Sequence, residues 1–360
     1  MVRYLFLTFY FQPSSNLSLT KKILLTGATG AIGTEILKQL KSQNRLSEVV
    51  VLVRDSKKTR KKLKPFEGQI TLHYGDVTKP ESLAEACQNV SVVIHLAGII
   101  PPLSEDNPEL GRRVNIEGTR NLIKAVETHS PDAFFMFSSS VVVYGDRLKT
   151  PNITVSDPLE KVHNDHYGLA KIEAESILQN SSLRWSIFRL TAIMGIGNHE
   201  ISGIMFIVPL DTPMEICTIR DTARAYVNSL DQQEQLERTV YNLGGGKSCR
   251  ISYKEFMSRA FNAFGMGAVN FPEYAFARQN FHCGYYADGD DLEEILHFRS
   301  DTIDTYFERF RASVPPLQRI VTRPFAGIIK WFLTRLSKPL KAYKQGDKER
   351  IKFYFGVIEK

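Results

Sequence analysis

The sequence is poor in cysteine and has no apolar run long enough to cross a membrane. Its 360 residues include four cysteines, none in a Cys-x-x-Cys pair. Scattered single thiols are typical of a protein kept reduced, and they argue against a disulfide framework or a metal site. No stretch reaches the ~18–20 apolar residues that a spanning helix needs. We therefore expect a cytoplasmic globular protein, with 43% hydrophobic and 24% charged residues.

An excess of charge is absent from most of the chain. The formal net charge is +7, but residues 317–360 contain 11 Lys/Arg and 3 Asp/Glu. The rest of the chain is therefore close to neutral, and this distribution does not predict a nucleic-acid-binding fold.

In the tail, residues 315–360, Trp331, Phe332 and aliphatic residues alternate with lysines and arginines. Such a segment either lies on an anionic membrane surface, which would place the protein at the inner face of a membrane, or packs on the body with its lysines in solvent. We favour packing, because Pro324 and Pro339 limit any continuous helix to a short one.

The first 20 residues precede the predicted fold. Met1–Arg3 and the apolar run Tyr4–Phe11 resemble a short signal peptide. The run is short, crowded with aromatic residues and not followed by a clear small-x-small cleavage site. We interpret residues 1–20 as an extension outside the fold.

Short apolar runs alternate with helix-period segments through residues 21–195. The runs are nearly all apolar, as strands buried on both faces of a sheet are. They are Lys22–Thr26, Val49–Val53, Ile70–Tyr74, Val90–Leu96, Ala133–Phe137 and Trp185–Leu190. The predicted helices between them include Gly33–Gln43, Ser82–Gln88 and Glu117–Thr128. The alternation predicts an α/β fold with a doubly wound parallel sheet.

The alternation weakens after about residue 195. We predict that residues 196–314 form a smaller substrate-binding cap of mixed α/β structure that partly returns to the main sheet. Its predicted elements are helices at Asp221–Leu230, Tyr253–Phe264 and Asp291–Ala312 and a strand near Val240–Leu243.

A glycine-rich motif, Thr26–Gly33, follows the first predicted strand and opens the first predicted helix. Gly27 permits a tight turn, Gly30 lets the backbone approach a pyrophosphate, and Gly33 lets helix and strand pack closely. The N-terminus of the helix offers N–H groups and partial positive charge to phosphates. The motif predicts a dinucleotide site, with contacts from Gly27, Thr29, Gly30, Ala31, Ile32 and Gly33.

The residues after the second strand bear on which dinucleotide binds. Val53 is followed by Arg54 and Asp55, with Lys57 and Lys58 close behind. An acidic residue directly at the strand end would accept the ribose hydroxyls of NAD. Arg54 instead suits the 2′-phosphate of NADP. The sequence favours NADP, and Asp55 keeps NAD as the alternative.

Tyr167 and Lys171 are four residues apart in a predicted helix, which places both on one face. A phenol with a pKa near ~10 is a poor base, and a neighbouring ammonium favours the phenolate. The spacing alone also fits a solvated helix face. A serine run, Ser138–Ser140, ends the fifth predicted strand and strengthens the catalytic interpretation.

Taken in order, these motifs resemble the extended short-chain dehydrogenase/reductase superfamily, which includes the NAD-dependent epimerase/dehydratase family. The glycine spacing is GxxGxxG, and the matches run over residues 22–195. The resemblance implies a Rossmann-type fold and additional cofactor contacts. These come from Asp76 and Val77 after the third strand and from Leu96, Ala97 and Gly98 after the fourth.

The resemblance also implies a catalytic set. Ser140 would hydrogen-bond the substrate oxygen, and Tyr167 would transfer the proton. Lys171 would lower the pKa of Tyr167 and hold the cofactor ribose. Asn115 matches an asparagine that serves as a relay or a positioning group.

Two departures from the family pattern argue against particular reactions of the family. Dehydratases carry an Asp-Glu pair where this chain has Val141 and Val142, so elimination lacks a proton carrier. Related epimerases grip the diphosphate with an arginine where Met214 is expected here, unless Arg220 or Arg224 substitutes.

We therefore predict an NAD(P)-dependent dehydrogenase or reductase acting on a smaller or more apolar alcohol or carbonyl compound. Pocket candidates are Arg189–His199 and the aromatic residues of Phe271–Tyr286, each of which also suits a core position. The alternatives are a nucleotide-sugar epimerase with tightly bound NAD and a non-catalytic dinucleotide-binding sensor or assembly subunit. The family resemblance also makes a homodimer the usual arrangement.

Overall fold

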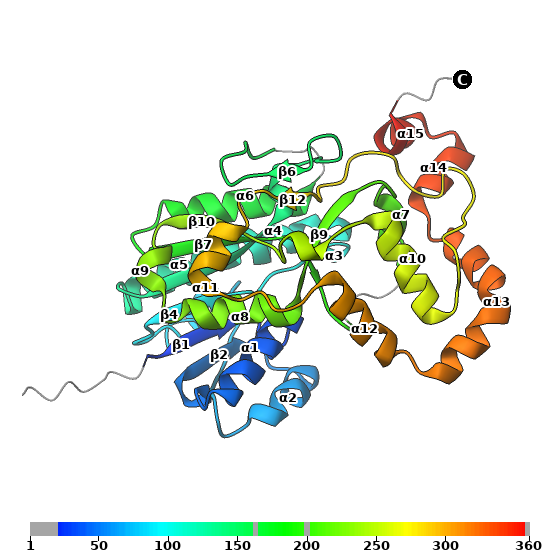
Figure 1. The fold of residues 1–360 in the computed structure, drawn as a ribbon. Helices are drawn as coiled ribbons and strands as arrows, with labels where there is room; N and C mark the ends of the chain where they lie inside the picture. Colours follow the sequence, from blue (N-terminus) through cyan, green and yellow to red (C-terminus); the bar gives the residue numbers. More distant parts are fainter. Residues whose placement is uncertain (1–20, 161–164, 198–201, 357–360) are drawn as a thin grey trace, which may run out of the picture.

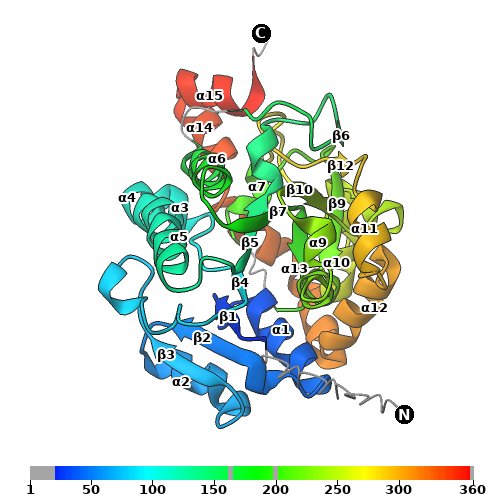
Figure 2. The ribbon, with the colours of Figure 1, turned by 90° about the vertical axis from the view of Figure 1, so that its left-hand side faces the viewer.

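The computed structural model describes residues 21–160, 165–197 and 202–356. The predicted N-terminal extension lies outside the described residues, as do residues 198 and 199 of one predicted pocket stretch. Figures 1 and 2 show a central sheet covered by helices on both faces, with the C-terminal helices at one edge of the molecule.

The central sheet has seven strands in the order β10-β7-β5-β4-β1-β2-β3, and every pair is parallel. All six predicted strand runs and the strand near residue 240 are confirmed. The strands are β1 (Ile23–Thr26), β2 (Val49–Val53), β3 (Thr71–Tyr74), β4 (Val92–His95), β5 (Phe134–Ser140), β7 (Arg184–Leu190) and β10 (Thr239–Leu243).

Alternate residues of these strands enter two separate cores, because successive side chains point to opposite faces. In β2, Val49, Val51 and Val53 join one core, and Val50 and Leu52 join the other. This explains why the strand sequences are apolar throughout. The first core is covered by α1 (Ala31–Ser42), α8 (Ile219–Ser229) and α11 (Asp290–Leu296), and the second by α5 (Gly118–His129) and α6 (His166–Gln179).

The second half of the chain adds a cap with its own core. Its three-stranded sheet has the order β11-β9-β8, and its strand β12 pairs with β6 from the first half of the chain. The strands are β6 (Asn152–Ile153), β8 (Ala192–Met194), β9 (Pro213–Thr218), β11 (Arg250–Ser252) and β12 (Tyr285–Tyr286). The cap helices are α7 (Ile204–Ile207), α10 (Tyr253–Phe264) and α12 (Ile303–Ser313). This half also returns to the main sheet, since β10 pairs with β7 and α9 (Gln233–Leu236) buries Leu236 in the first core.

Two predicted helices differ in the structure. Ser82–Gln88 forms turns after a short 3-10 segment, Pro80–Ser82, because Asn89 at φ 55° ends the segment before a regular helix extends. Asp291–Ala312 is broken into α11 and α12. His297 takes a left-handed conformation at φ 46°, and Asp221 accepts hydrogen bonds from the backbone of the connecting segment.

The tail forms α13 (Pro316–Thr334), α14 (Lys338–Gln345) and α15 (Lys348–Phe355). The limit expected at Pro324 is wrong, since this proline lies inside α13. Pro324 and Ile320, whose carbonyl loses its usual partner there, are both exposed, so water is able to solvate that carbonyl. Pro339 falls in the first turn of α14, where proline is tolerated. A search of the described helices finds none with the length and apolar content needed to span a bilayer.

Candidate active site

The glycine-rich loop connects β1 to α1 and packs against the end of β4. Gly27 has φ +72°, and a Cβ there would lie 2.7 Å from the carbonyl carbon of Leu96. A Cβ on Gly33 would lie 2.4 Å from the carbonyl oxygen of Gly27. The turn and the close packing that the sequence predicts therefore both require glycine.

The N-terminus of α1 is suited to a phosphate. Gly30 is the N-cap residue, and its N–H donates to the carbonyl of Gly27 (2.9 Å). The first turn of α1, which begins with Ala31 and Ile32, has no acidic residue. The Lys62 ammonium donates to the carbonyl of Thr29 (2.7 Å) and adds positive charge beside the loop. This glycine cradle and helix end fit a dinucleotide pyrophosphate.

A buried histidine lies beneath the loop. His95 Nδ1 is 2.7 Å from Thr26 Oγ1, and Nε2 is 3.1 Å from Thr119 Oγ1. The N–H of Ala97 also donates to Thr26 Oγ1 (3.2 Å). This hydrogen bond joins β1 to the predicted cofactor-flanking turn. Burial, aided by the charge of Lys171, lowers the pKa of His95 to about 3. His95 was not among the predicted site residues, although a histidine at the end of an apolar strand would have indicated it.

Asn115 lies in a π-helical turn, Arg113–Glu117. Its side-chain amide forms hydrogen bonds with both the N–H and the carbonyl of Ile99. Ile99 N donates to Asn115 Oδ1 (2.7 Å), and Asn115 Nδ2 donates to Ile99 O (2.8 Å). Gly98 is adjacent, where a Cβ would lie 3.2 Å from Asn115 Oδ1. This arrangement fixes the Leu96–Gly98 turn. Within the described residues, no hydrogen bond joins the Asn115 side chain to Tyr167 or Lys171.

The residues expected to contact adenosine lie after β2 and β3. Arg54 is exposed and forms no ion pair with any described residue. Both carboxylate oxygens of Asp55 accept hydrogen bonds from the Arg60 guanidinium, from Nε at 2.8 Å and from Nη2 at 2.7 Å. Asp76 accepts hydrogen bonds from the N–H and the hydroxyl of Thr78, and Val77 is buried.

Ser140, Tyr167 and Lys171 come together at the carboxyl end of β5. Ser140 is the last residue of β5, and Tyr167 and Lys171 are one turn apart on α6. The start of α6 is fixed from two sides: Asp165 accepts the N–H of Gly168, and Glu105 on α3 (Leu103–Asp106) accepts the N–H of Tyr167 (2.9 Å). The predicted catalytic set is thus assembled by the fold.

The environment shifts the proton affinities of this set. Burial raises the pKa of Tyr167, and a hydrogen bond with Ser140 opposes that shift. The lowering expected from Lys171 does not appear in the chain alone. Lys171 Nζ lies 5.8 Å from the Tyr167 ring centroid and donates to the carbonyl of Ser138 (2.6 Å). Burial lowers the pKa of Lys171 to about 8, while the charge of Glu175 raises it.

Glu175, whose charge raises the pKa of Lys171, forms a buried ion pair with Arg189. The Arg189 guanidinium donates to both oxygens of Glu175, with Nη2 at 2.8 Å, and the two side chains are 5% and 2% exposed. The Ser139 hydroxyl also donates to Glu175, and Arg189 Nη1 donates to the Tyr144 hydroxyl (2.8 Å). Glu175 was not among the predicted site residues. A carboxylate four residues after Lys171 on a largely buried helix would have indicated it.

The structure also describes the residues that distinguish dehydratases and epimerases from dehydrogenases at the sequence level. Val141 and Val142 are buried in an apolar cluster. Met214 is buried in the cap core. Arg220 lies 3.9 Å from Asp301, and Arg224 pairs with Asp221 at 2.7 Å. Aromatic residues of the predicted pocket stretch, Phe271–Tyr286, pack largely into the cap core.

The model of the NAD dependent epimerase/dehydratase family matches residues 23–244, more than half of the chain. The chain belongs to this family. It therefore falls within the short-chain dehydrogenase/reductase superfamily and has a Rossmann fold, as the sequence predicts. Other members are dehydrogenases, epimerases and dehydratases.

Curated relatives include proteins with different reactions. The sterol-4-alpha-carboxylate 3-dehydrogenase (decarboxylating) of Schizosaccharomyces pombe is 30% identical over 184 residues, 50% of this chain and 52% of the relative. The UDP-glucose 4-epimerase of Neisseria meningitidis serogroup C is 33% identical over 193 residues, 51% and 56% of the two chains. The chain thus spans about half the length of the curated relatives it matches.

The solved structure of UDP-glucuronic acid 4-epimerase from Bacillus cereus, in complex with UDP-glucuronic acid and NAD, has the same fold. It superposes with a TM-score of 0.67 at 20% identity, over 81% of this chain and 98% of that one. A dTDP-glucose 4,6-dehydratase from Streptomyces venezuelae gives 0.66 at 19% identity, over 81% and 97%.

Proposed function

We propose that this chain is an NADP-dependent dehydrogenase or reductase that moves a hydride at a carbinol or carbonyl carbon of a small, apolar substrate. The observation that carries the proposal is the convergence of Ser140, Tyr167 and Lys171 at the end of β5, on the carboxyl edge of the sheet that also forms the glycine-rich loop. When bound, the nicotinamide supplies or accepts the hydride.

The protein's own groups handle the oxygen and its proton. The Ser140 hydroxyl donates a hydrogen bond to the substrate oxygen and keeps it near Tyr167. The Tyr167 phenol gives a proton to that oxygen during reduction and removes one during oxidation. Lys171 contributes positive charge beside the phenol, and Asn115 acts as a positioning group by fixing the turn at Ile99.

NADP is preferred in this proposal because of the charges after β2. Arg54 is exposed and faces no carboxylate in the described chain, whereas Asp55 is already bound by Arg60. A 2′-phosphate would gain a charge-assisted pair with Arg54. The ribose hydroxyls of NAD would compete with Arg60 for Asp55.

An apolar substrate is supported by the matched relatives. They include the sterol dehydrogenase above and 3 beta-hydroxysteroid dehydrogenase type 7 of Mus musculus, 31% identical over 166 residues. Water elimination is disfavoured separately, because Val141 and Val142 stand where dehydratases carry an Asp-Glu pair as acid and base.

A nucleotide-sugar epimerase is the second candidate, favoured by the likeness to UDP-glucose 4-epimerase. Against it, Met214 is buried, and Arg220 and Arg224 already face carboxylates. A diphosphate would have to displace one of these ion pairs.

The two candidates differ in cofactor stoichiometry. Purified protein is incubated with NADPH or NADH and a panel of ketones, including 3-ketosteroids, and separately with UDP-glucose. A dehydrogenase consumes added cofactor, seen as falling near-ultraviolet absorbance of the reduced nicotinamide. An epimerase recycles bound cofactor with no net absorbance change while the sugar product accumulates. Epimer formation without cofactor consumption would replace the proposal with the second candidate.

A further inference from the structure

The outer face of α13 is apolar and exposed. Seven of its large apolar side chains are between 53% and 70% exposed: Leu317, Ile320, Val321, Phe325, Ile328, Trp331 and Phe332. Monomeric proteins rarely expose so many large apolar side chains next to one another, and such surfaces mark interaction sites.

The spacing of these residues makes them one continuous stripe. Leu317, Val321, Phe325, Ile328 and Phe332 follow one another at steps of three or four residues, so they share one face of the helix. An adjacent face is already used, since Ile329 and Leu333 pack against the cap core. The exposed stripe is therefore not needed to attach α13 to the protein.

The tail is held in place by bonds to one loop of the cap. Lys330 Nζ donates to the carbonyl of Ala268 (2.6 Å), and the Ser337 hydroxyl donates to that of Ala275 (2.7 Å). Tyr274 stacks on Tyr343 with ring centroids 3.8 Å apart. This attachment fixes which face of α13 points outward, at the edge of the molecule seen in Figure 1.

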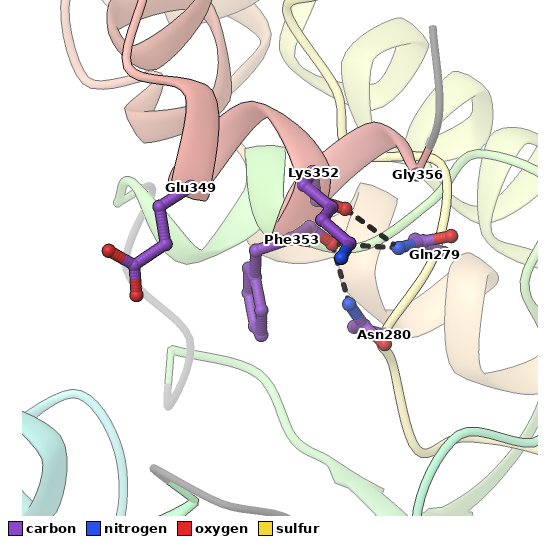
Figure 3. A pocket seen from close by; sticks show the side chains of 6 residues that line it. All are labelled: Gln279, Asn280, Glu349, Lys352, Phe353 and Gly356. Atoms are coloured by element: carbon purple, nitrogen blue, oxygen red, sulfur yellow. Dashed lines mark hydrogen bonds between the residues drawn. The ribbon is translucent and has the colours of Figure 1, made fainter.

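The last helix is attached to the same loop. Gln279 Nε2 donates to the carbonyls of Lys352 and Phe353 (both 3.1 Å), and Asn280 Nδ2 also donates to Phe353 O. Figure 3 shows these bonds at a hollow of about 370 Å³ beside α15. The lining residues include none of the predicted catalytic set. The hollow is thus where the tail is attached, and the tail packs on the body as the sequence favours.

The charge around the stripe indicates what covers it. Residues 316–346 contain seven Lys/Arg and no Asp/Glu. Five of these basic residues are exposed and form no ion pair with the described part of the chain: Arg323, Arg335, Lys338, Lys341 and Lys344. The Arg335 guanidinium lies 4.0 Å from the Trp331 ring centroid, so a cation lies directly beside the exposed apolar residues.

We propose that α13 docks in the surface of an anionic lipid bilayer. The stripe would enter the boundary between headgroups and acyl chains, and the exposed cations would contact lipid phosphates and carboxylates. With 19 residues, α13 is about 28 Å long, so it would lie in the plane of the surface. A second copy of the chain fits less well, because a two-fold contact through this face would bring the basic segments close together.

Co-sedimentation with vesicles tests the proposal on the full-length protein. Vesicles of phosphatidylcholine alone are compared with vesicles that also contain phosphatidylserine. We expect pelleting with the anionic vesicles, weakened by added salt. The double variant Ile328→Gln/Phe332→Gln is expected to reduce the bound fraction at least about tenfold, because it removes large apolar groups from the stripe.

The matched control is Ile100→Gln/Leu103→Gln, which alters two equally exposed apolar residues outside the tail. It should pellet like the wild type. The charge variant Arg323→Gln/Lys341→Gln/Lys344→Gln should lose at least about tenfold in binding to anionic vesicles, since each cation contributes. Circular dichroism and thermal melting confirm that each variant is folded.

Several results would overturn the proposal. Failure of the wild type to pellet with anionic vesicles at low salt would do so. Equal binding to phosphatidylcholine alone would remove the role of charge. A dimer in size-exclusion chromatography that Ile328→Gln/Phe332→Gln dissociates, without vesicle binding by the wild type, would assign the stripe to a second copy. All these readouts are independent of enzymatic activity.

Discussion

The carboxylate of Glu175 follows Lys171 by one turn of α6 and raises the pKa of that lysine against the burial that lowers it to about 8. Glu175 is itself held by the bidentate hydrogen bonds of Arg189. The charge of Lys171 near neutral pH therefore depends on an acidic side chain that is only 2% exposed.

Glu175→Gln should move the alkaline limb of the pH–rate profile to lower pH. Without the carboxylate, nothing offsets the desolvation of Lys171, so its pKa falls further below about 8 and the ammonium is lost earlier on the way up in pH. We expect a shift of about one pH unit or more in kcat/KM. An unchanged alkaline limb would show that Glu175 does not set the charge of Lys171.

The same variant should also be less stable, because it leaves Arg189 buried without a counter-charge. Breaking a buried pair costs about 3–5 kcal/mol. Glu237→Gln is the matched control. Glu237 pairs with Arg184, which lies on the same strand as Arg189, and the two side chains of this pair are each about one-third exposed. It should cost less than about 1 kcal/mol and leave the pH profile unchanged. Urea unfolding measures both, and Glu175→Asp replaces the glutamine variant if the latter does not fold.

Tyr167→Phe should reduce kcat by roughly 10²–10⁴-fold, because the phenol is the group that exchanges the proton with the substrate oxygen. Cofactor affinity, followed by quenching of protein fluorescence, should change little. Tyr241→Phe is the control, since its hydroxyl donates to the carbonyl of Gln235 at the edge of the sheet. Full activity in Tyr167→Phe would refute the assignment.

Arg54→Ala should weaken NADP binding by roughly tenfold or more and leave NAD binding nearly unchanged, because only NADP presents a 2′-phosphate to this side chain. Titration of both nucleotides into wild type and variant gives the comparison. Lys64→Ala, which removes an exposed cation after α2 (Lys57–Leu63), controls for the general loss of positive charge. A wild type that prefers NAD by tenfold would contradict the assignment of Arg54.

His95 should make the protein sensitive to mild acid. Its folded pKa is about 3, below the ordinary 6.5. Between these values the unfolded chain takes up a proton that the folded chain does not, so stability falls as pH decreases. His95→Gln removes this proton uptake. Urea unfolding between about pH 4 and 7 should show a flatter pH dependence in this variant than in His129→Gln, the control. Equal slopes would show that His95 is not the group responsible.

The strands and the helix that carries Tyr167 and Lys171 were predictable because both depend on local patterns. Apolar runs of strand length identify β1 to β5 and β7, and the spacing of Tyr167 and Lys171 defines a shared helix face. The turns at Ser82–Gln88 and the break at His297 were not predictable. They depend on left-handed residues and, at the break, on backbone bonds to Asp221 from a distant helix.

By itself, the sequence determined the family, the doubly wound sheet and the helix face shared by Tyr167 and Lys171, because glycine spacing, strand composition and helical periodicity are local properties of the chain. Only the tertiary structure decided that Asn115 holds Ile99, that Glu175 and Arg189 support Lys171, and that one apolar face of α13 stays uncovered. The spacing of Glu175 and Lys171 is local, but the contacts of Asn115 with Ile99, of Glu175 with Arg189 and of α13 with the cap join separate segments, and no local pattern specifies how those segments pack.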